Sequence, residues 1–375
     1  MTDSKFSIIE EHNKKRISEG KISCATAMVI KSGETVYHGI FGTADIEAGK
    51  PLCKNALFRL ASMTKPVVSA AIMREFDAGK LDIFDEIARF IPSFDKMHIG
   101  AMVDGKPKDT GVTKNNIRIV DLLTHSSGLG SGPVGDAQSG EFFPKTNETL
   151  GDVIPKLGNM LLDFEPRTNL AYSGLFAFDT MAHIVEISSG MTFPDYLSKY
   201  IFAPIGIRDI TYAPTDEQWN RVVTMYEDTG HGCRRVEMGR NAFGTLSQSY
   251  TSGGAGLIGS IEDYSRFVMM LAGGGKYEGV RVLSENAVRL MRTSHQPMLH
   301  PINAYPEMWG LGMRVINQKN AVLPHGSFGW SGAYGTHFWI DPSNDIVALY
   351  CSNMTTAGGA GAETAREFER DVMGI

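Results

Sequence analysis

Strand-forming patterns lie near the two ends of this chain, and helix-forming patterns dominate the long stretch between them. Runs of β-branched and apolar residues typical of strands fall at residues 25–30, 35–41, 309–316, 336–340 and 346–351. Turn-forming residues join the first two runs at 31–34 and the last two at 341–345, which predicts a hairpin near each end. Because isolated strands are not stable, we expect both ends to share one domain.

Helical spacing of apolar residues predicts helices at residues 6–18, 65–78, 175–188 and from about 362 onward. A chain of 375 residues is long enough for one large domain or two interleaved ones. We therefore predict a discontinuous α/β domain formed by residues 1–90 and 255–375. A mostly helical domain at residues 91–254 interrupts it.

Charge and cysteine content limit the partners of the chain. The formal net charge is −6 with mixed signs, which argues against nucleic acid or an anionic membrane as the main partner. The first 20 residues lack the apolar core of a secretory signal, and the longest apolar run, Phe267–Ala272, is too short to span a bilayer. Four scattered cysteines show no metal-ligand spacing. We expect a cytoplasmic protein with reduced thiols and no metal or cofactor.

Glycine is unusually frequent, with 41 residues, about 11% of the chain against roughly 7% in average proteins. One segment, Gly254–Gly259, matches the dinucleotide-binding pattern G-x-G-x-x-G. The residues before it are polar rather than strand-like, and no βαβ unit surrounds it. A glycine turn that leads into a helix capped by Ser260 and Asp263 is the better interpretation. The competing hypothesis of dinucleotide binding predicts saturable NAD binding, which we do not expect.

Serine nucleophiles with a nearby base occur in two kinds of pattern. The nearest approach to a G-x-S-x-G elbow is Gly329–Ala333, but it precedes a predicted strand, so Ser331 is a weak candidate. The pattern S-x-x-K occurs three times, at Ser18/Lys21, Ser62/Lys65 and Ser93/Lys96. Of the three, only Ser62/Lys65 lies where an apolar run meets the start of a predicted buried helix.

The spacing of Ser62 and Lys65 suits nucleophilic catalysis. Residues three apart on a helix share a face, so the lysine amine can reach the serine hydroxyl. A serine hydroxyl becomes a good nucleophile when a base takes its proton, and a lysine beside an apolar wall can be that base. The residues alone leave a second interpretation open, in which Ser62 caps the helix and Lys65 is an ordinary surface residue.

Four segments, in order, resemble motifs of the class C β-lactamase-like superfamily of serine hydrolases. They are the active-site serine motif at Phe58–Lys65, the segment Asp121–Leu129, the tyrosine motif at Asn169–Gly174 and the glycine-rich stretch from Gly253 to Leu283. The superfamily includes penicillin-binding DD-peptidases, family VIII carboxylesterases and D-amino-acid amidases. The resemblance implies an antiparallel sheet flanked by helices plus a mostly helical domain, with the active site between the two.

The resemblance also implies roles for individual residues. Ser62 matches the acylated nucleophile, and Lys65 and Tyr172 match the pair that relays its proton. A lysine cation favours the phenolate of a neighbouring tyrosine, and neither group can be assigned as the sole base. The backbone N–H groups of Ser62 and Ala333 match the oxyanion hole. The residues expected to contact substrate are Trp330, Ser331, Gly332, Tyr334 and Gly174.

Two departures from the superfamily pattern favour an esterase. Gly174 replaces an asparagine that contacts the amide side chain of β-lactam substrates. Trp330 stands where many members carry a cationic residue, and it resembles the Trp-Gly-Gly variant of family VIII esterases. We predict a carboxylesterase that forms an acyl-enzyme on small or medium esters. An amidase, D-aminopeptidase, β-lactamase or DD-peptidase using the same residues is the first alternative, and a catalytically silent binding protein is the second. His125 is interpreted as a structural residue.

Overall fold

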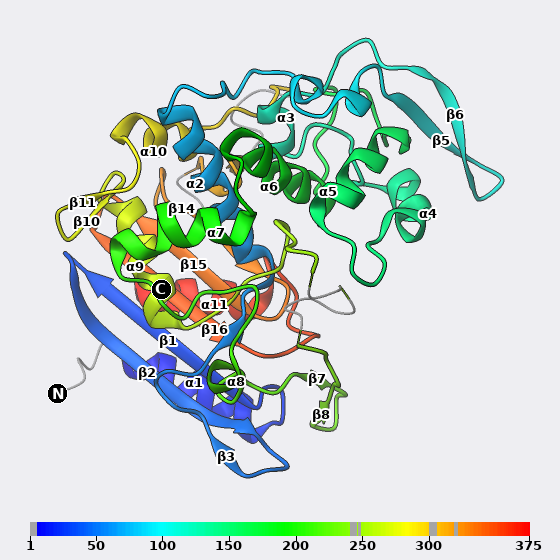
Figure 1. Cartoon of the computed structure of the whole chain (residues 1–375). Coiled ribbons are helices and arrows are strands. Elements are labelled where there is room, and N and C mark those ends of the chain that lie inside the picture. The colour runs from blue at the N-terminus through cyan, green and yellow to red at the C-terminus, as the bar shows by residue number, and fades with distance from the viewer. Residues whose placement is uncertain (1–5, 241–245, 247–248, 300–305, 319–321) are drawn as a thin grey trace.

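The chain was analysed as a computed structural model, which describes residues 6–240, 246, 249–299, 306–318 and 322–375. Its central element is an eight-stranded antiparallel sheet (Figure 1). In sheet order the strands are β12 (Glu307–Trp309), β13 (Arg314–Ile316), β14 (Phe328–Gly332), β15 (Thr336–Asp341), β16 (Ile346–Ser352), β1 (Cys24–Lys31), β2 (Glu34–Asp45) and β3 (Lys50–Pro51).

The two ends of the chain meet in the middle of this sheet. Strand β1 pairs antiparallel with β16, so that Met28 lies opposite Leu349. Strand β16 is buried on both faces. Leu349 points into the core beneath α9 (Ile261–Ala272), and its neighbour Tyr350 points into a second core beneath α1 (Ser7–Ser18) and α11 (Glu363–Met373). A strand covered on both sides favours apolar residues on both of its faces, which explains the continuous hydrophobic run in this part of the sequence.

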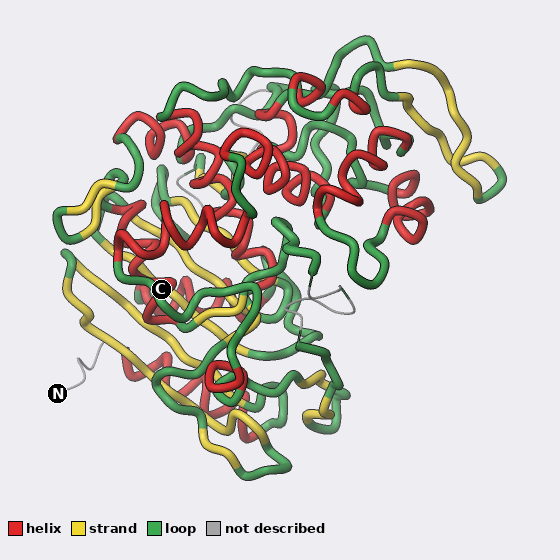
Figure 2. The backbone as a smooth tube through the Cα atoms, in the orientation of Figure 1, coloured by secondary structure: helices red, strands yellow, loops and turns green. Residues whose placement is uncertain are grey.

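The remaining helices lie mainly to one side of the sheet (Figure 2). They are α2 (Thr64–Asp77), α3 (Ile119–Leu123), α4 (Pro133–Phe142), α5 (Leu150–Val153), α6 (Phe176–Ser189), α7 (Phe193–Leu197), α8 (Asp216–Trp219) and α10 (Glu285–Met291). Helix α2 packs against α6. The fold is therefore a mixed α/β structure with a large antiparallel sheet, as expected. The division into domains at residues 90 and 255 stays a prediction.

Short two-stranded ladders complete the fold. They pair β4 (Phe58–Arg59) with β9 (Ile258–Gly259), β5 (His98–Val103) with β6 (Lys106–Val112), β7 (Tyr226–Asp228) with β8 (Cys233–Arg235), and β10 (Lys276–Tyr277) with β11 (Val280–Arg281). The hairpin β5–β6, which projects from the helical part in Figure 1, was not predicted. Its second strand is exposed almost throughout, so it lacks the alternation of apolar residues that marks a strand in a sequence.

The predicted single strand at 309–316 is wrong. The structure divides it into β12 and β13, which pair antiparallel with Trp309 opposite Arg314. Gly312, with a φ of 73°, lies in the turn between them, in the left-handed region that glycine adopts readily. None of the described helices is both long and apolar enough to cross a membrane.

Candidate active site

Ser62 lies in a tight turn that leads into α2. The turn, a 3-10 segment over Ala61–Met63, is fixed from both sides: Leu60 N donates to Leu257 O at 2.9 Å, and the Tyr264 hydroxyl donates to Met63 O at 2.7 Å. Ala61 has a φ of 47°, an unfavourable value for a residue with a side chain. Such strain persists where the surrounding structure enforces it, and it is common at functional sites. The turn leaves Ser62 partly exposed.

Lys65 is fully buried one helical turn further along. Its Nζ donates to Ser62 Oγ at 3.2 Å, to Gly174 O at 2.6 Å and to Gly254 O at 2.8 Å. These acceptors match the three N–H donors of an ammonium group. The interpretation of Lys65 as a surface residue is therefore wrong, because none of its surface is exposed.

Close packing around Gly254 gives the dinucleotide-like glycine pattern a structural explanation. A side chain at this position would meet the Cα of Leu175 at 2.7 Å and the carbonyl oxygen of Gly174 at 2.9 Å, so only glycine brings its carbonyl to Lys65 without a shift. The helix that follows is capped as expected, with Ser260 Oγ accepting from Asp263 N at 3.1 Å. The glycines of this segment thus bring backbone to the lysine.

Asp179 supports Gly254 from behind, and sequence analysis missed it. Its carboxylate accepts from Gly254 N at 2.8 Å, from the Tyr250 hydroxyl at 2.8 Å and from Ser252 Oγ at 2.7 Å. Burial raises the pKa of Asp179, while these donors and the charge of Lys65 oppose that rise. The available signal was a carboxylate among the mainly apolar residues of the first turns of α6.

Tyr172 completes a group of three converging side chains. Its hydroxyl lies 2.9 Å from Ser62 Oγ, and the Lys65 Nζ lies 4.9 Å from the centre of its ring. The side chain is 41% exposed, so Tyr172 is not part of the hydrophobic core. The structure therefore brings together all three residues that the sequence proposed as catalytic.

His125 holds the segment that carries Tyr172. The carbonyl of His125 accepts from Ala171 N at 3.0 Å, and its Nδ1 accepts from Ser173 N at 3.1 Å, so the residues on both sides of Tyr172 are fixed. The ring centres of His125 and Tyr172 are 4.6 Å apart. Burial, together with the charge of Lys65, lowers the pKa of His125 well below 6.5 and keeps the imidazole neutral. The residue is structural, as expected, but it acts directly on Tyr172.

Aromatic rings form a wall beside Ser62. Trp330, on β14, lies with its ring centre 5.6 Å from that of Tyr172 and 4.7 Å from that of Trp309. Trp309, at the end of β12, stacks on Tyr172 with 6.2 Å between ring centres. Sequence analysis did not identify Trp309, because its place in the wall depends on the pairing of β12 with β13. Trp330, the residue of β14 that faces the site, is thus an aromatic side chain without a charge.

The end of β14 lies against the serine turn. A side chain at Gly332 would come within 2.2 Å of Leu60 O, so the two backbones touch there. Thr336 Oγ1 donates to the same carbonyl at 2.9 Å. In the described part of the chain, the N–H groups of Ser62 and Ala333 have no hydrogen-bond acceptor. Both amides are thus available for an oxyanion.

Three predicted substrate contacts have different outcomes. The Ser331 side chain lies on the opposite face of β14, where its hydroxyl is 2.7 Å from His337 Nδ1, so the prediction that it contacts substrate is wrong. Side chains alternate along a strand, and Trp330 takes the site face. Tyr334 is buried against Ala61. Gly174 holds Lys65 through its carbonyl, and a side chain there would meet no atom within 4 Å.

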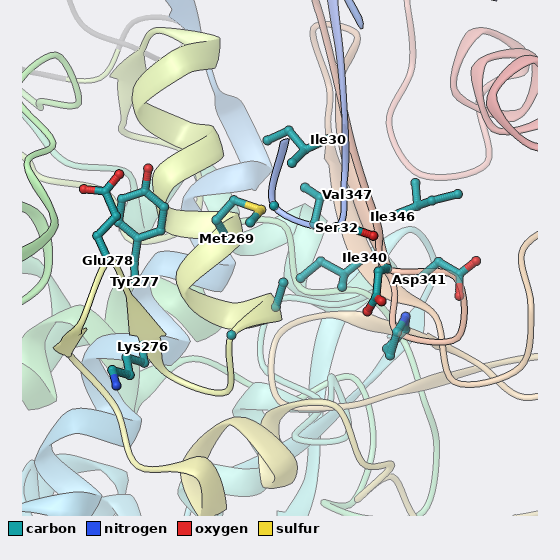
Figure 3. A pocket seen from close by; sticks show the side chains of 15 residues that line it. Ile30, Ser32, Met269, Lys276, Tyr277, Glu278, Ile340, Asp341, Ile346 and Val347 are labelled. Atoms are coloured by element: carbon teal, nitrogen blue, oxygen red, sulfur yellow. The ribbon is translucent and has the colours of Figure 1, made fainter. Parts of the chain in front are cut away.

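A cavity of about 600 Å³ lies elsewhere, between α9, β10 and the turns that follow β1 and β15 (Figure 3). Apolar side chains, including Ile30, Met269 and Val347, form much of its lining. No residue proposed for the active site lines it. By spacing, His12, Glu367 and Asp371 could hold a metal ion, but Arg16 pairs with Glu367 and His12 pairs with Asp371.

Comparisons with known proteins identify the family of the chain and proteins with a similar fold. A family model described as Beta-lactamase matches residues 7–370. Protein Rv1367c of Mycobacterium tuberculosis (strain ATCC 25618 / H37Rv) is 33% identical over 351 residues, covering 88% of this chain and 86% of that protein. Esterase EstB of Burkholderia gladioli is 26% identical over 377 residues, covering 93% and 90%. A solved structure of EstCE1, described as a hydrolase with promiscuous acyltransferase activity, superposes with a TM-score of 0.80 at 24% identity, covering 99% and 98%.

Proposed function

This chain belongs to the beta-lactamase family of serine hydrolases, and on that premise we propose that it is a carboxylesterase acting through an acyl-enzyme on Ser62. The observation that carries the proposal is the convergence of Lys65 Nζ and the Tyr172 hydroxyl on Ser62 Oγ, at 3.2 and 2.9 Å. A nucleophile within hydrogen-bond reach of its base is the arrangement that serine acylation requires.

The acylation step follows from these contacts. Ser62 Oγ attacks the ester carbonyl carbon, and its proton passes to the oxygen of Tyr172, which lies within reach and acts as the phenolate. Lys65, held by two carbonyls, stays in place beside the tyrosine and stabilises negative charge there. The carbonyl oxygen becomes an oxyanion that accepts from Ser62 N–H and Ala333 N–H. When the tetrahedral intermediate collapses, the C–O bond to the alcohol breaks and the alcohol takes the proton.

Deacylation reverses the same sequence with water as the nucleophile. Water attacks the acyl carbon, its proton passes to the Tyr172–Lys65 pair, and Ser62 leaves with a proton returned from that pair. An alcohol in place of water would give acyl transfer instead of hydrolysis. No step needs a metal ion or an organic cofactor.

The preference for esters rests on the wall of the site. Trp330 and Trp309 present aromatic surface where a cation would attract the carboxylate of a β-lactam or a peptide. Gly174 leaves open space in place of an amide that would contact a substrate side chain. The similarity to Esterase EstB supports the same preference. We propose that Trp330, Gly332, Tyr334 and Gly174 line the substrate site.

A side-by-side assay tests this proposal. We expect turnover of p-nitrophenyl butyrate and none of nitrocefin or of a D-alanyl-D-alanine peptide, and we expect Ser62→Ala to abolish the ester activity. Faster turnover of nitrocefin or of the peptide would favour the β-lactamase or DD-peptidase alternative. Absence of all three activities, with no labelling by a fluorophosphonate, would favour a silent binding protein.

We also propose a cytoplasmic location. All four cysteines are free, including the exposed Cys53. Free thiols persist in reducing compartments, whereas oxidising ones favour disulfides. Labelling of Cys53 by a thiol reagent in intact cells compared with lysates would test the location.

A further inference from the structure

Arg59, three residues before the proposed nucleophile, is a buried cation that pairs with no acidic side chain among the described residues. Its side chain is 3% exposed. One terminal nitrogen donates to Gly239 O at 3.1 Å, the other lies 3.5 Å from Val223 O, and Nε has no partner in the described part of the chain. Its Cζ lies 5.3 Å from the ring centre of Trp219. Carbonyls and an aromatic ring orient the guanidinium, but they carry no compensating charge.

The acids nearby are already paired. Arg59 lines a cavity of about 240 Å³ whose lining includes two carboxylates, Asp45 and Glu237. Arg235 pairs with both, at 3.1 Å and 2.9 Å. Among the segments outside the described residues, the sequence offers one acid, Asp3, near the N-terminus. The lining therefore has three cations, Lys50, Arg59 and Arg235, against two anions, and neither of these carboxylates pairs with Arg59.

Burial makes this charge expensive. Removal from water lowers the pKa of Arg59 to about 10, although arginine stays charged at neutral pH. An uncompensated buried charge is among the costliest features a protein can retain, and an anion that binds it recovers that cost. Trp219 packs on the face of the guanidinium. In the described part of the chain, Nε–H has no acceptor, and each terminal nitrogen contacts one carbonyl. Nε–H and a neighbouring terminal N–H together match the two oxygens of a carboxylate.

The cavity adjoins the proposed active site. Two of its lining residues, Met225 and Met238, pack with Ala61, Ala333 and Tyr334 in one hydrophobic cluster. Those three residues flank the serine turn and the end of β14. An occupant of the cavity would therefore press on the wall that carries both proposed oxyanion amides. The volume is slightly below the roughly 300–1,000 Å³ of drug-sized pockets, which suits a ligand of a few heavy atoms.

We propose that this cavity is a binding site for a small carboxylate, with Arg59 as the residue that binds it. The carboxylate belongs either to the acyl chain of the substrate or to a separate organic anion, and both sources use the same contact. The binding itself goes beyond the proposed function and does not depend on it. For this reason the test begins with a protein that cannot turn over.

Tryptophan fluorescence of the Ser62→Ala protein tests the site. Acetate and succinate are titrated while sodium HEPES holds the ionic strength constant. We expect a saturable change in emission, because Trp219 lies against the guanidinium. In Trp219→Phe the change should vanish, while the active-site tryptophans Trp309 and Trp330 stay in place. No saturable change, or one that survives Trp219→Phe, would overturn the proposal.

Substitution of the arginine tests the contact. Arg59→Gln should weaken carboxylate binding at least tenfold, and Arg59→Lys should weaken it less, because a lysine keeps the charge but loses the fork. Arg89→Gln removes one exposed positive charge outside the cavity and should leave the affinity unchanged. Circular dichroism checks that each variant folds. Equal affinity in the folded Arg59 and Arg89 variants would contradict the role of Arg59, and the Trp219→Phe comparison decides the location if Arg59→Gln does not fold.

Esterase assays then identify the source of the carboxylate. If the substrate carries it, Arg59→Gln lowers kcat/KM for mono-p-nitrophenyl glutarate at least tenfold more than for p-nitrophenyl butyrate. If a separate anion carries it, acetate changes butyrate hydrolysis by the wild type and has no effect on Arg59→Gln. If neither the substrate comparison nor the acetate experiment gives the expected result, the proposed link between the cavity and the active site is wrong. Absence of any ester hydrolysis would count against the proposed function alone, because the binding experiment uses Ser62→Ala.

Discussion

The side chains of Lys65, three residues away, and Tyr172, 110 residues away, converge within hydrogen-bond distance of Ser62 Oγ. The S-x-x-K spacing identified Ser62 and Lys65, and the resemblance to a family added Tyr172. The residues that hold them were not predictable from the sequence. His125 and Asp179 act through contacts with segments far along the chain, and Trp309 reaches the wall only because β12 folds back on β13. Patterns in a sequence report neighbours along a helix or strand, and they do not report such tertiary contacts.

Removal of the Tyr172 hydroxyl tests its role as a proton carrier. We expect Tyr172→Phe to lower kcat by about 10²–10⁴, the range that positioned general acid–base groups supply. KM should change little, because the ring and its contacts with Trp309 and Trp330 remain. Tyr277→Phe, which removes a phenol from the 600 Å³ cavity, is the control. A kcat for Tyr172→Phe equal to that of the control would exclude the tyrosine from proton transfer.

Two substitutions of His125 distinguish the contribution of its Nδ1 acceptor from that of its ring. The residue has a φ of 56°, which asparagine tolerates better than most residues, and the asparagine Oδ1 can take the place of Nδ1. We expect His125→Asn to keep kcat/KM within about tenfold, and His125→Phe to lose about 10²-fold by displacing Tyr172. The kcat of both should have the same pH dependence as the wild type, because a neutral imidazole does not titrate in the working range. A loss in His125→Asn as large as that in His125→Phe would show that an acceptor for Ser173 N–H does not by itself maintain the site.

At the scale of elements, the site depends on how closely β14 approaches the serine turn. The sequence predicted four of the eight strands of the sheet, β1, β2, β15 and β16, because each carries a run of β-branched and apolar residues. It did not predict β14, whose buried residues include two glycines and a serine. It failed for exposed elements such as β6, whose residues are exposed on both faces and show no alternation of apolar residues. It also could not show that Gly332 touches Leu60, since that contact joins segments about 270 residues apart along the chain. The function of a glycine is therefore visible only in the folded structure.

A methyl group at Gly332 should separate these two elements. The added carbon would lie 2.2 Å from both Leu60 O and Thr336 Oγ1, so β14 must move. We expect Gly332→Ala to lower the free energy of unfolding by about 1–3 kcal/mol, as overpacking does, and to lower kcat through displacement of the Ala333 amide. Gly174→Ala is the matched control for stability, because its side chain would enter open space. Equal urea midpoints for the two variants would contradict the close contact.

At the scale of the whole molecule, a buried ionic network ties the C-terminal helix to the sheet. Glu369 of α11 pairs with Arg314 of β13, with Arg366 of its own helix and with His337 of β15, 3.2 Å away. His337 in turn meets the Ser331 hydroxyl behind Trp330. Burial alone would raise the pKa of Glu369, but the His337 hydrogen bond and the Arg314 charge outweigh it and hold the pKa far below 4.5.

The sign of this shift fixes a pH dependence. A carboxyl group whose pKa is lower in the folded state stabilises the fold above its unfolded pKa and loses that contribution as the pH falls toward the folded value. Glu369→Gln should therefore cost about 3–5 kcal/mol at pH 7, as the loss of one partner in a buried pair does. The deficit should shrink as the pH falls below about 4.5. Urea unfolding of the wild type and of Glu369→Gln at pH 7 and pH 4 measures this difference in stability. A difference that is larger at pH 4 would contradict the prediction.

The account as a whole depends on a covalent bond between Ser62 and an acyl group. Intact-mass spectrometry after rapid acid quench of a reaction with p-nitrophenyl butyrate measures it directly. We predict an added mass of one butyryl group, which peptide mapping locates on Ser62. This acyl-enzyme should accumulate in a variant that is slowed in deacylation, and it should be absent from Ser62→Ala. An acyl group on Ser331 or on any other residue, or ester turnover that persists in Ser62→Ala, would contradict the central claim.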